Sequence, residues 1–149
     1  NMSLQENVDK QLKDAMRAKD TIALESLRAI KTAIMMTQTQ AGAKELTFED
    51  EIKLIQKLVK QRKDSSEIFY KQGRVDLAEP EEAQIKIIEQ FLPEQLDQAA
   101  ITEIVEAIIV KIGAGGMKDM GKVMGMASKE MAGKADGKTI STIVRKKLS

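Results

Sequence analysis

Lysine and glycine residues are concentrated in residues 121–139, GKVMGMASKEMAGKADGKT, which hold four lysines, four glycines and three methionines. Apolar residues in this stretch recur at the three- and four-residue steps of a helix. On a helical wheel three lysines share the face opposite the apolar side: Lys118, Lys122 and Lys129. Gly125 lies beside these lysines, and Gly121 lies between the two faces. Ammonium groups next to bare backbone could neutralise the phosphates of a polyanion.

A structural explanation of the same glycines stays open at this point. Small residues four positions apart allow two helices to approach closely, and Gly121 and Gly125 have this spacing. The apolar side of the helix, with Val123, Met124, Ala127 and Met131, is expected to face the core, and Met126 to lie near the edge of the lysine face. Each glycine inside a helix costs about 0.8–1.0 kcal/mol relative to alanine, so some large group is expected to come close to both.

Positive charge continues beyond this helix. The residues after Gln98 carry nine basic and five acidic groups, and no aromatic residue follows Phe91. A nucleic acid would therefore be bound through backbone charge and duplex shape rather than through stacked bases. The predicted nucleic-acid-binding residues are Lys118, Gly121, Lys122, Gly125, Lys129, Lys134, Lys138, Arg145 and Lys146.

Most catalytic and metal chemistry is excluded by composition, since the chain has no cysteine and no histidine. The carboxylate clusters at residues 49–51 and 79–82 are expected at helix N-termini, where the macrodipole favours them. The stretch GKADGKT resembles a phosphate-binding P-loop, but three residues separate its glycines where the pattern needs four, and no strand precedes it. We predict no catalytic residue, no metal site and no cofactor.

A second group of charged residues lies in the first half of the chain, in the stretches LRAIK and KQRKDS. Ion pairs between neighbouring helices are common, so we expect these side chains to form a polar seam rather than a binding patch. The seam comprises Arg28, Lys31, Lys60, Arg62, Lys63 and Asp64.

Helical periodicity along nearly the whole chain predicts an all-α fold, with a four-helix bundle over residues 2–92. The first helix is expected over residues 4–18, and the second from its N-cap Asp20 to residue 40, where Gly42 follows. A capping box at Thr47 opens a third helix that ends at Gly73. The fourth is expected to start between residues 77 and 81, capped by Asp76, because proline 80 is tolerated only in a first turn, and to end at residue 92.

The remaining residues predict a three-helix subdomain over 99–149, joined to the bundle by a linker over 93–98. Its helices are expected at about 99–112, 119–131 and 138–148, with the glycine-rich stretch 113–116 (GAGG) as a hinge. No apolar run approaches the roughly 20 residues needed to span a bilayer, and no basic flank precedes an apolar block at the N-terminus. We therefore expect a cytoplasmic protein, without membrane contact, and a monomer.

Six stretches resemble the YqeY family in order and spacing over essentially the whole chain: LRAIK, KQRKDS, GRVDLA, FLPEQL, KDMGKVMG and GKADG. Phe91 stands where tyrosine is usual in the family. The family is similar in turn to the tail domain of GatB, the subunit of the glutamine-dependent Asp/Glu-tRNA amidotransferase that engages tRNA. The resemblance implies a four-helix bundle followed by a three-helix subdomain, and contact with tRNA through the second subdomain.

Three functions stay open at the level of sequence. The first is a non-catalytic module that binds tRNA or another structured RNA, with a tRNA amidotransferase or aminoacyl-tRNA synthetase complex as a candidate assembly. The second is a carbon–nitrogen ligase that takes its amide nitrogen from glutamine, or an accessory subunit of such an enzyme. Only the similarity to GatB supports this second function. The third is a protein-interaction module whose methionine-rich surface, including Met117 and Met126, packs on partner helices.

Overall fold

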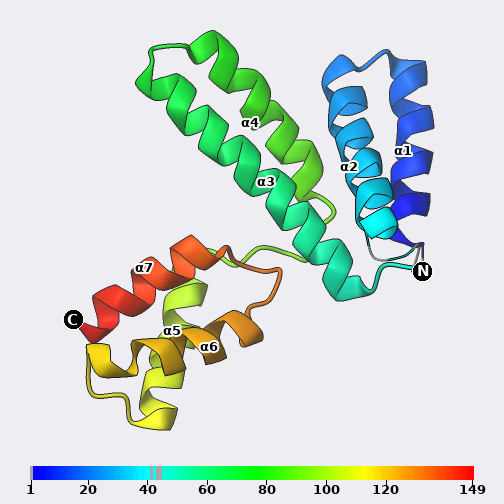
Figure 1. Ribbon diagram of the computed structural model, residues 1–149. Coiled ribbons are helices and arrows are strands. Elements are labelled where there is room, and N and C mark those ends of the chain that lie inside the picture. Colours follow the sequence, from blue (N-terminus) through cyan, green and yellow to red (C-terminus); the bar gives the residue numbers. More distant parts are fainter. Residues whose placement is uncertain (1, 41, 43–44) are drawn as a thin grey trace. The chain divides into compact units, whose positions relative to one another are not determined.

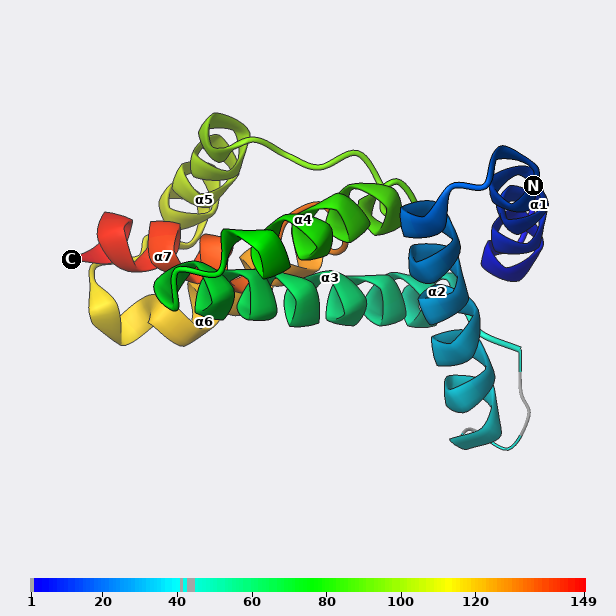
Figure 2. The same ribbon diagram turned by 90° about the horizontal axis from the view of Figure 1, so that it is seen from above.

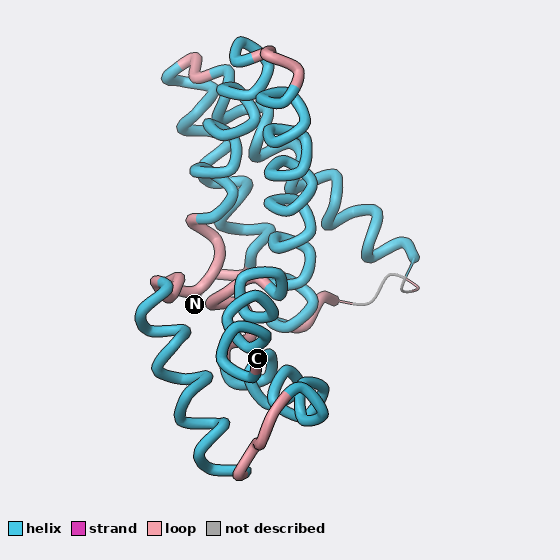
Figure 3. Tube along the Cα trace, turned by 90° about the vertical axis from the view of Figure 1, so that its left-hand side faces the viewer, coloured by secondary structure: helices cyan, strands magenta, loops and turns pink. Residues whose placement is uncertain are grey.

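The protein is helical throughout the part of the chain that the computed structural model describes, residues 2–40, 42 and 45–149. Figure 1 shows the helices in chain order, and the tube in Figure 3 shows loops between helices and no strand in the same residues. The prediction of an all-α fold is confirmed. The chain divides into two compact units, one that ends at Leu92 and one that spans Pro93–Ser149.

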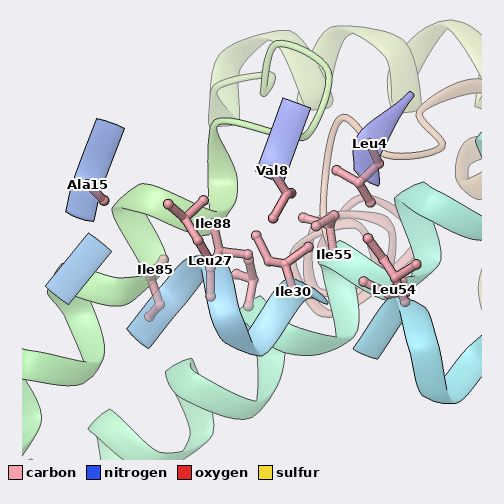
Figure 4. Packing of buried hydrophobic residues seen from close by; sticks show 11 residues of the cluster. Leu4, Val8, Ala15, Leu27, Ile30, Leu54, Ile55, Ile85 and Ile88 are labelled. Carbon is pink, nitrogen blue, oxygen red and sulfur yellow. The ribbon is translucent and has the colours of Figure 1, made fainter. Parts of the chain in front are cut away.

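The first unit is built from two helical hairpins (Figures 1 and 2). α1 (Leu4–Ala18) pairs with α2 (Thr21–Gln40), and α3 (Phe48–Lys71) pairs with α4 (Val75–Glu89). α2 also packs against α4 and, over a smaller area, against α3. The hairpins enclose one core, in which side chains from all four helices point toward one another in Figure 4. The most deeply buried members are Val8, Leu27, Ile30, Ile34, Ile55 and Ile88.

Helix ends in the first unit follow the signals in the sequence. Asp20 Oδ1 accepts a hydrogen bond of 3.1 Å from the Ala23 N–H at the start of α2. Thr47 and Asp50 form a reciprocal capping box, with N–H to oxygen distances of 3.0 and 3.1 Å. Gly73 has a φ of +71° just after α3, the left-handed conformation that favours glycine.

α4 departs from the prediction at both ends. It begins at Val75, so Pro80 lies inside the helix, and Asp76 does not cap it. Instead the Asp76 carboxylate accepts two hydrogen bonds from the Arg74 guanidinium, at 3.0 and 2.9 Å, while the Arg74 carbonyl accepts from the Leu77 and Ala78 N–H groups. Ala78 is fully buried, so this extra turn is held by core packing as well as by hydrogen bonds.

The end of α4 comes three residues earlier than predicted, at Glu89. The next N–H groups, of Phe91 and Leu92, donate to carbonyls only three residues back, those of Ile88 and Glu89. These tighter turns take the chain out of the α-helix before it reaches Pro93, which disfavours helical backbone at the residue before it.

The second unit contains three mutually contacting helices, α5 (Gln98–Ile112), α6 (Met120–Glu130) and α7 (Gly137–Leu148). A short 3₁₀ turn, η1 (Met117–Asp119), precedes α6, so the predicted helix over 119–131 is divided between the two elements. Asp97 caps α5 through the Ala100 N–H at 2.8 Å, and Gly113 ends it with a φ of +66°. The fully buried core residues of this unit are Val105, Val123, Ala127, Met131 and Val144.

Residues 93–97 are attached to the second unit by hydrogen bonds. The Leu96 N–H donates to the Lys134 carbonyl at 2.9 Å, in the turn between α6 and α7. Gln95 Nε2 donates to the Gly133 carbonyl in the same turn at 2.7 Å. The predicted linker therefore supports the turn that carries Lys134.

Candidate nucleic-acid interface

α6 buries the face that the wheel predicts. Val123, Ala127 and the following Met131 are each 0% exposed, and half-buried Met124 packs against the same core. Lys122 and Lys129 are exposed on the opposite side. The orientation of α6 thus follows from its apolar spacing, as expected for an amphipathic helix.

The two glycines of α6 face open space. Both Gly121 and Gly125 are exposed, and a Cβ atom built on either would meet no atom within 4 Å. Packing against a neighbouring helix of the same unit therefore does not explain them, and that structural interpretation is wrong. Gly125 lies well inside α6, where the helix loses stability relative to alanine with no compensating contact in the described residues.

The lysines around these glycines are exposed and lack ionic partners within the described part of the second unit. They are Lys118, Lys122, Lys129, Lys134 and Lys138. By contrast, Lys147 Nζ lies 3.5 Å from Glu106 Oε1, in an ion pair between α7 and α5. Unpaired exposed ammonium groups exchange only mobile counterions when a phosphate binds, which favours binding to a polyanion.

α7 adds further positive charge to the unit. Lys138 and Arg145 are seven residues apart and share the side of α7 opposite buried Ile140 and Val144. Lys146 lies about 100° away from Arg145 around the helix, so it extends a different flank. The predicted basic residues therefore lie on more than one side of α7.

The two ends of α6 both carry lysine. η1, with Lys118, packs against α7, and the backbone at Gly116 lies beside the Leu148 carbonyl at the end of that helix. At the other end, Lys134 lies in the turn that leads into α7. Positive charge thus extends along the whole length of α6.

The stretch that resembles a P-loop is a turn followed by a capped helix. Gly133 has a φ of +76°, and Asp136 Oδ1 accepts from the Thr139 N–H at 2.7 Å as the N-cap of α7. Within the described residues no strand leads into it. The Asp136 carboxylate thus occupies the helix N-terminus where a phosphate would bind in a P-loop.

Carboxylates of the two clusters accept hydrogen bonds within α3 and from neighbouring helices. Asp50 serves the capping box, and the hydrogen bond from the Thr47 N–H lowers the pKa of its carboxyl. Glu51 Oε2 accepts from the Leu4 N–H at 3.1 Å, which joins α3 to the start of α1. Glu82 accepts a hydrogen bond from the Tyr70 hydroxyl, and this bond raises the pKa of Tyr70.

No three acidic side chains in the described ranges come together in a group that could hold a metal ion. The absence of a metal site and of a catalytic residue in the whole chain both stay predictions.

The predicted polar seam is only partly brought together. Arg62 Nε donates to Gln84 Oε1 at 2.9 Å, and Gln84 Nε2 donates to Glu25 Oε2 at 3.1 Å, so this chain of bonds joins α3, α4 and α2.

Other members of the predicted seam lie elsewhere. Lys31 pairs with Asp9 of α1 at 3.0 Å, and Lys60 pairs with Asp64 within α3 at 2.9 Å. Lys63 lines a groove between α3 and α4, and exposed Arg28 lines another between α2 and α3.

The methionines that reach the surface differ from those expected. Met117 is 46% exposed, but Met126 packs against the core of the second unit. Met35 and Met36 on α2 are more exposed, at 57% and 58%, and neither was predicted to be a surface residue of this kind. The helical wheel of α2 places both away from Ile30 and Ile34, which is the signal that could have found them.

Comparison with known proteins places this fold in context. The family model described as "Yqey-like protein" matches residues 5–148. A relative named "Altered inheritance of mitochondria protein 41, mitochondrial" from Lachancea thermotolerans is 41% identical over 66% of this chain and 52% of its own length. A protein of the same name from Pyrenophora tritici-repentis is 32% identical over 83% of this chain and 68% of its own. The chain thus spans about half of the first relative's length.

A third similarity is shorter. A glutamyl-tRNA(Gln) amidotransferase subunit from Thermococcus gammatolerans is 38% identical over 46% of this chain, which corresponds to 12% of that protein. Among the described residues, no helix is long and apolar enough to cross a membrane.

Proposed function

The chain belongs to the YqeY-like family, and on that premise we propose that it is a non-catalytic module that binds tRNA through α6 and α7 of its second unit. The interface consists of the exposed lysines along α6, the open backbone at Gly121 and Gly125, and the basic residues of α7. It would contact the phosphates of a folded RNA and read the shape of its duplex.

The observation that carries this proposal is the open space at the two glycines. A solvent-exposed glycine inside a helix lowers stability, and no neighbour within the described residues compensates for it at Gly125. A phosphate backbone that lies against α6 would gain from the missing Cβ, because its oxygens could come closer to the helix and to Lys122 and Lys129. A purely solvated face would have no use for glycine.

The shorter match supports tRNA as the polyanion. The similar protein is, by its name, part of an amidotransferase that acts on glutamyl-tRNA(Gln). Since the matched region is about an eighth of that protein, binding is the part of the activity that we extend to this chain. Assembly with an amidotransferase or an aminoacyl-tRNA synthetase complex, and action in the cytoplasm, are parts of the same proposal.

A salt titration of tRNA binding tests the proposal. If about five phosphates are neutralised, log K falls with log salt concentration at a slope of about −3.5 to −4.5. Lys122→Glu with Lys129→Glu removes two of these contacts, so we expect at least about tenfold weaker binding and a shallower slope by about 1.4–1.8.

The matched control is Lys10→Glu with Lys13→Glu on α1, which changes the formal net charge equally and alters two exposed lysines of the first unit. This variant should bind tRNA almost as the wild type does. Equal losses in the two double variants would mean that only overall charge matters, and no loss in either would exclude the α6 face.

A further inference from the structure

The first unit has a groove between α2 and α3 whose walls have the pattern of a helix-binding site. Its volume is about 490 Å³, and its residues come from both helices. On α2 the lining residues Ala29, Ala33 and Met36 are spaced four and three apart, and on α3 Leu54 and Leu58 are spaced four apart. Each wall is therefore one continuous stripe of a helix, the arrangement into which a third helix packs.

The side chains of the groove suit an apolar surface of variable shape. The two alanines let another backbone come close to α2, and Leu58 is only half-buried. Met36 is 58% exposed, and its unbranched thioether side chain can adapt to a partner's surface. An RNA backbone is charged and has no apolar surface to pack against these groups. An amphipathic helix would cover them with its own apolar face.

The charges that line the groove set the chemistry of the occupant. The one lining carboxylate, that of Glu25, accepts the hydrogen bond from Gln84 Nε2. The cations of Arg28 and Lys57 are exposed, and neither has an ionic partner in residues 2–40, 42 or 45–149. From residue 32 to residue 40, α2 has no charged side chain. A complementary partner must therefore bring carboxylates to meet the two cations.

We propose that the α2–α3 groove binds an amphipathic helix of a partner protein, whose apolar face packs on Ala29, Ala33 and Met36 and whose acidic residues pair with Arg28 and Lys57. The site lies in the first unit and does not depend on RNA binding by the second. A chain with both sites would join an RNA to a protein through separate surfaces.

Two neighbouring methionines provide a matched crosslinking experiment. Met35 and Met36 are almost equally exposed, but only Met36 lines the groove. The full chain is expressed in cells with p-benzoylphenylalanine at position 36 or, as the control, at position 35. After irradiation, the crosslinked segment is identified by mass spectrometry. We expect position 36, and not position 35, to crosslink to a helical protein segment with acidic residues on one side.

The synthetic peptide of the crosslinked segment is then titrated by fluorescence polarisation. Met36→Glu places a carboxylate in the wall and should weaken binding about tenfold, while Met35→Glu should change it less than about twofold. Arg28→Glu with Lys57→Glu should also weaken binding about tenfold, since two exposed ion pairs become repulsive contacts. Circular dichroism checks that each variant keeps its helix content.

Several results would overturn the proposal. These are crosslinks equal at positions 35 and 36, no crosslink above the control, crosslinks to RNA, and crosslinks to a second copy of the chain. If the peptide binds the Arg28→Glu, Lys57→Glu variant as tightly as the wild type, the proposal of an acidic helix is also rejected. None of these results bears on tRNA binding by α6, which the Lys122 and Lys129 variants test separately.

Discussion

Replacement of Gly125 by alanine should stabilise the protein and weaken tRNA binding at the same time. Gly125 has ordinary helical backbone inside α6, and its added Cβ would meet no atom within 4 Å. The substitution therefore introduces neither strain nor new packing in the folded state. The gain is the difference in helix propensity, about 0.8–1.0 kcal/mol in the free energy of unfolding.

Hydrogen exchange of α6 amides is the appropriate stability assay. The chain has no tryptophan, and its single tyrosine lies in the first unit, so no tryptophan or tyrosine side chain reports on α6. A gain of about 0.8–1.0 kcal/mol slows exchange through opening of α6 about four- to fivefold. In the same variant, a methyl group between the helix and a bound phosphate should weaken tRNA binding about three- to tenfold, as for one weakened hydrogen bond.

The exchange rate tests whether the space beside Gly125 is open in the folded chain, and the tRNA affinity tests whether RNA approaches it. Faster exchange in Gly125→Ala would show that the folded chain does fill the space beside this glycine. Slower exchange with unchanged tRNA affinity would show that no RNA backbone approaches it, and the α6 interface would lose its main support.

Three other substitutions give further tests. Gly113→Ala also meets no atom within 4 Å, but its φ of +66° strains alanine, so we expect a loss of about 1–2 kcal/mol in unfolding free energy, measured by thermal denaturation. The hydrogen bond to Glu82 raises the pKa of Tyr70 above its usual 10.0, so Glu82→Gln should lower the tyrosinate titration midpoint followed by ultraviolet absorbance. The stability from this bond is present below pH 10 and is lost as the pH rises through the folded pKa; unchanged titration would contradict it. Met131→Ala removes a fully buried side chain and should lower the unfolding free energy by about 2–5 kcal/mol in chemical denaturation, whereas a loss below about 1 kcal/mol would indicate a loosely packed core.

The helices themselves could be predicted because their signals are local. Thr47 and Asp50 are three residues apart and form the capping box without help from the rest of the fold. The start of α4 could not be predicted in this way, because it depends on the hydrogen bonds around Arg74 and on the burial of Ala78, which the local sequence does not reveal. Asp76 as a cap and Pro80 in a first turn both indicated a later start, but α4 begins at Val75 and includes both residues.

The candidate interface was predictable in part. The spacing of the lysines on α6 placed them opposite the core, and the structure has them exposed. Whether Gly121 and Gly125 met a neighbouring helix or open space could not be decided from sequence, because that depends on which side of α6 the other helices occupy. The α2–α3 groove could not be predicted either, because its walls come from residues far apart in the chain, such as Ala33 and Leu58.

The hydrogen bonds of Gln95 and Leu96 to the turn before α7 determine where the chain can be cut for dissection. A fragment that starts at Ala99 would lack both donors, leaving the Gly133 and Lys134 carbonyls to solvent. Its Lys134 ammonium would then sit on a looser loop, and weak binding by such a fragment would be an artefact of truncation. A fragment that starts at Pro93 contains the whole second unit and keeps these bonds, so its RNA affinity can be compared with that of the intact chain.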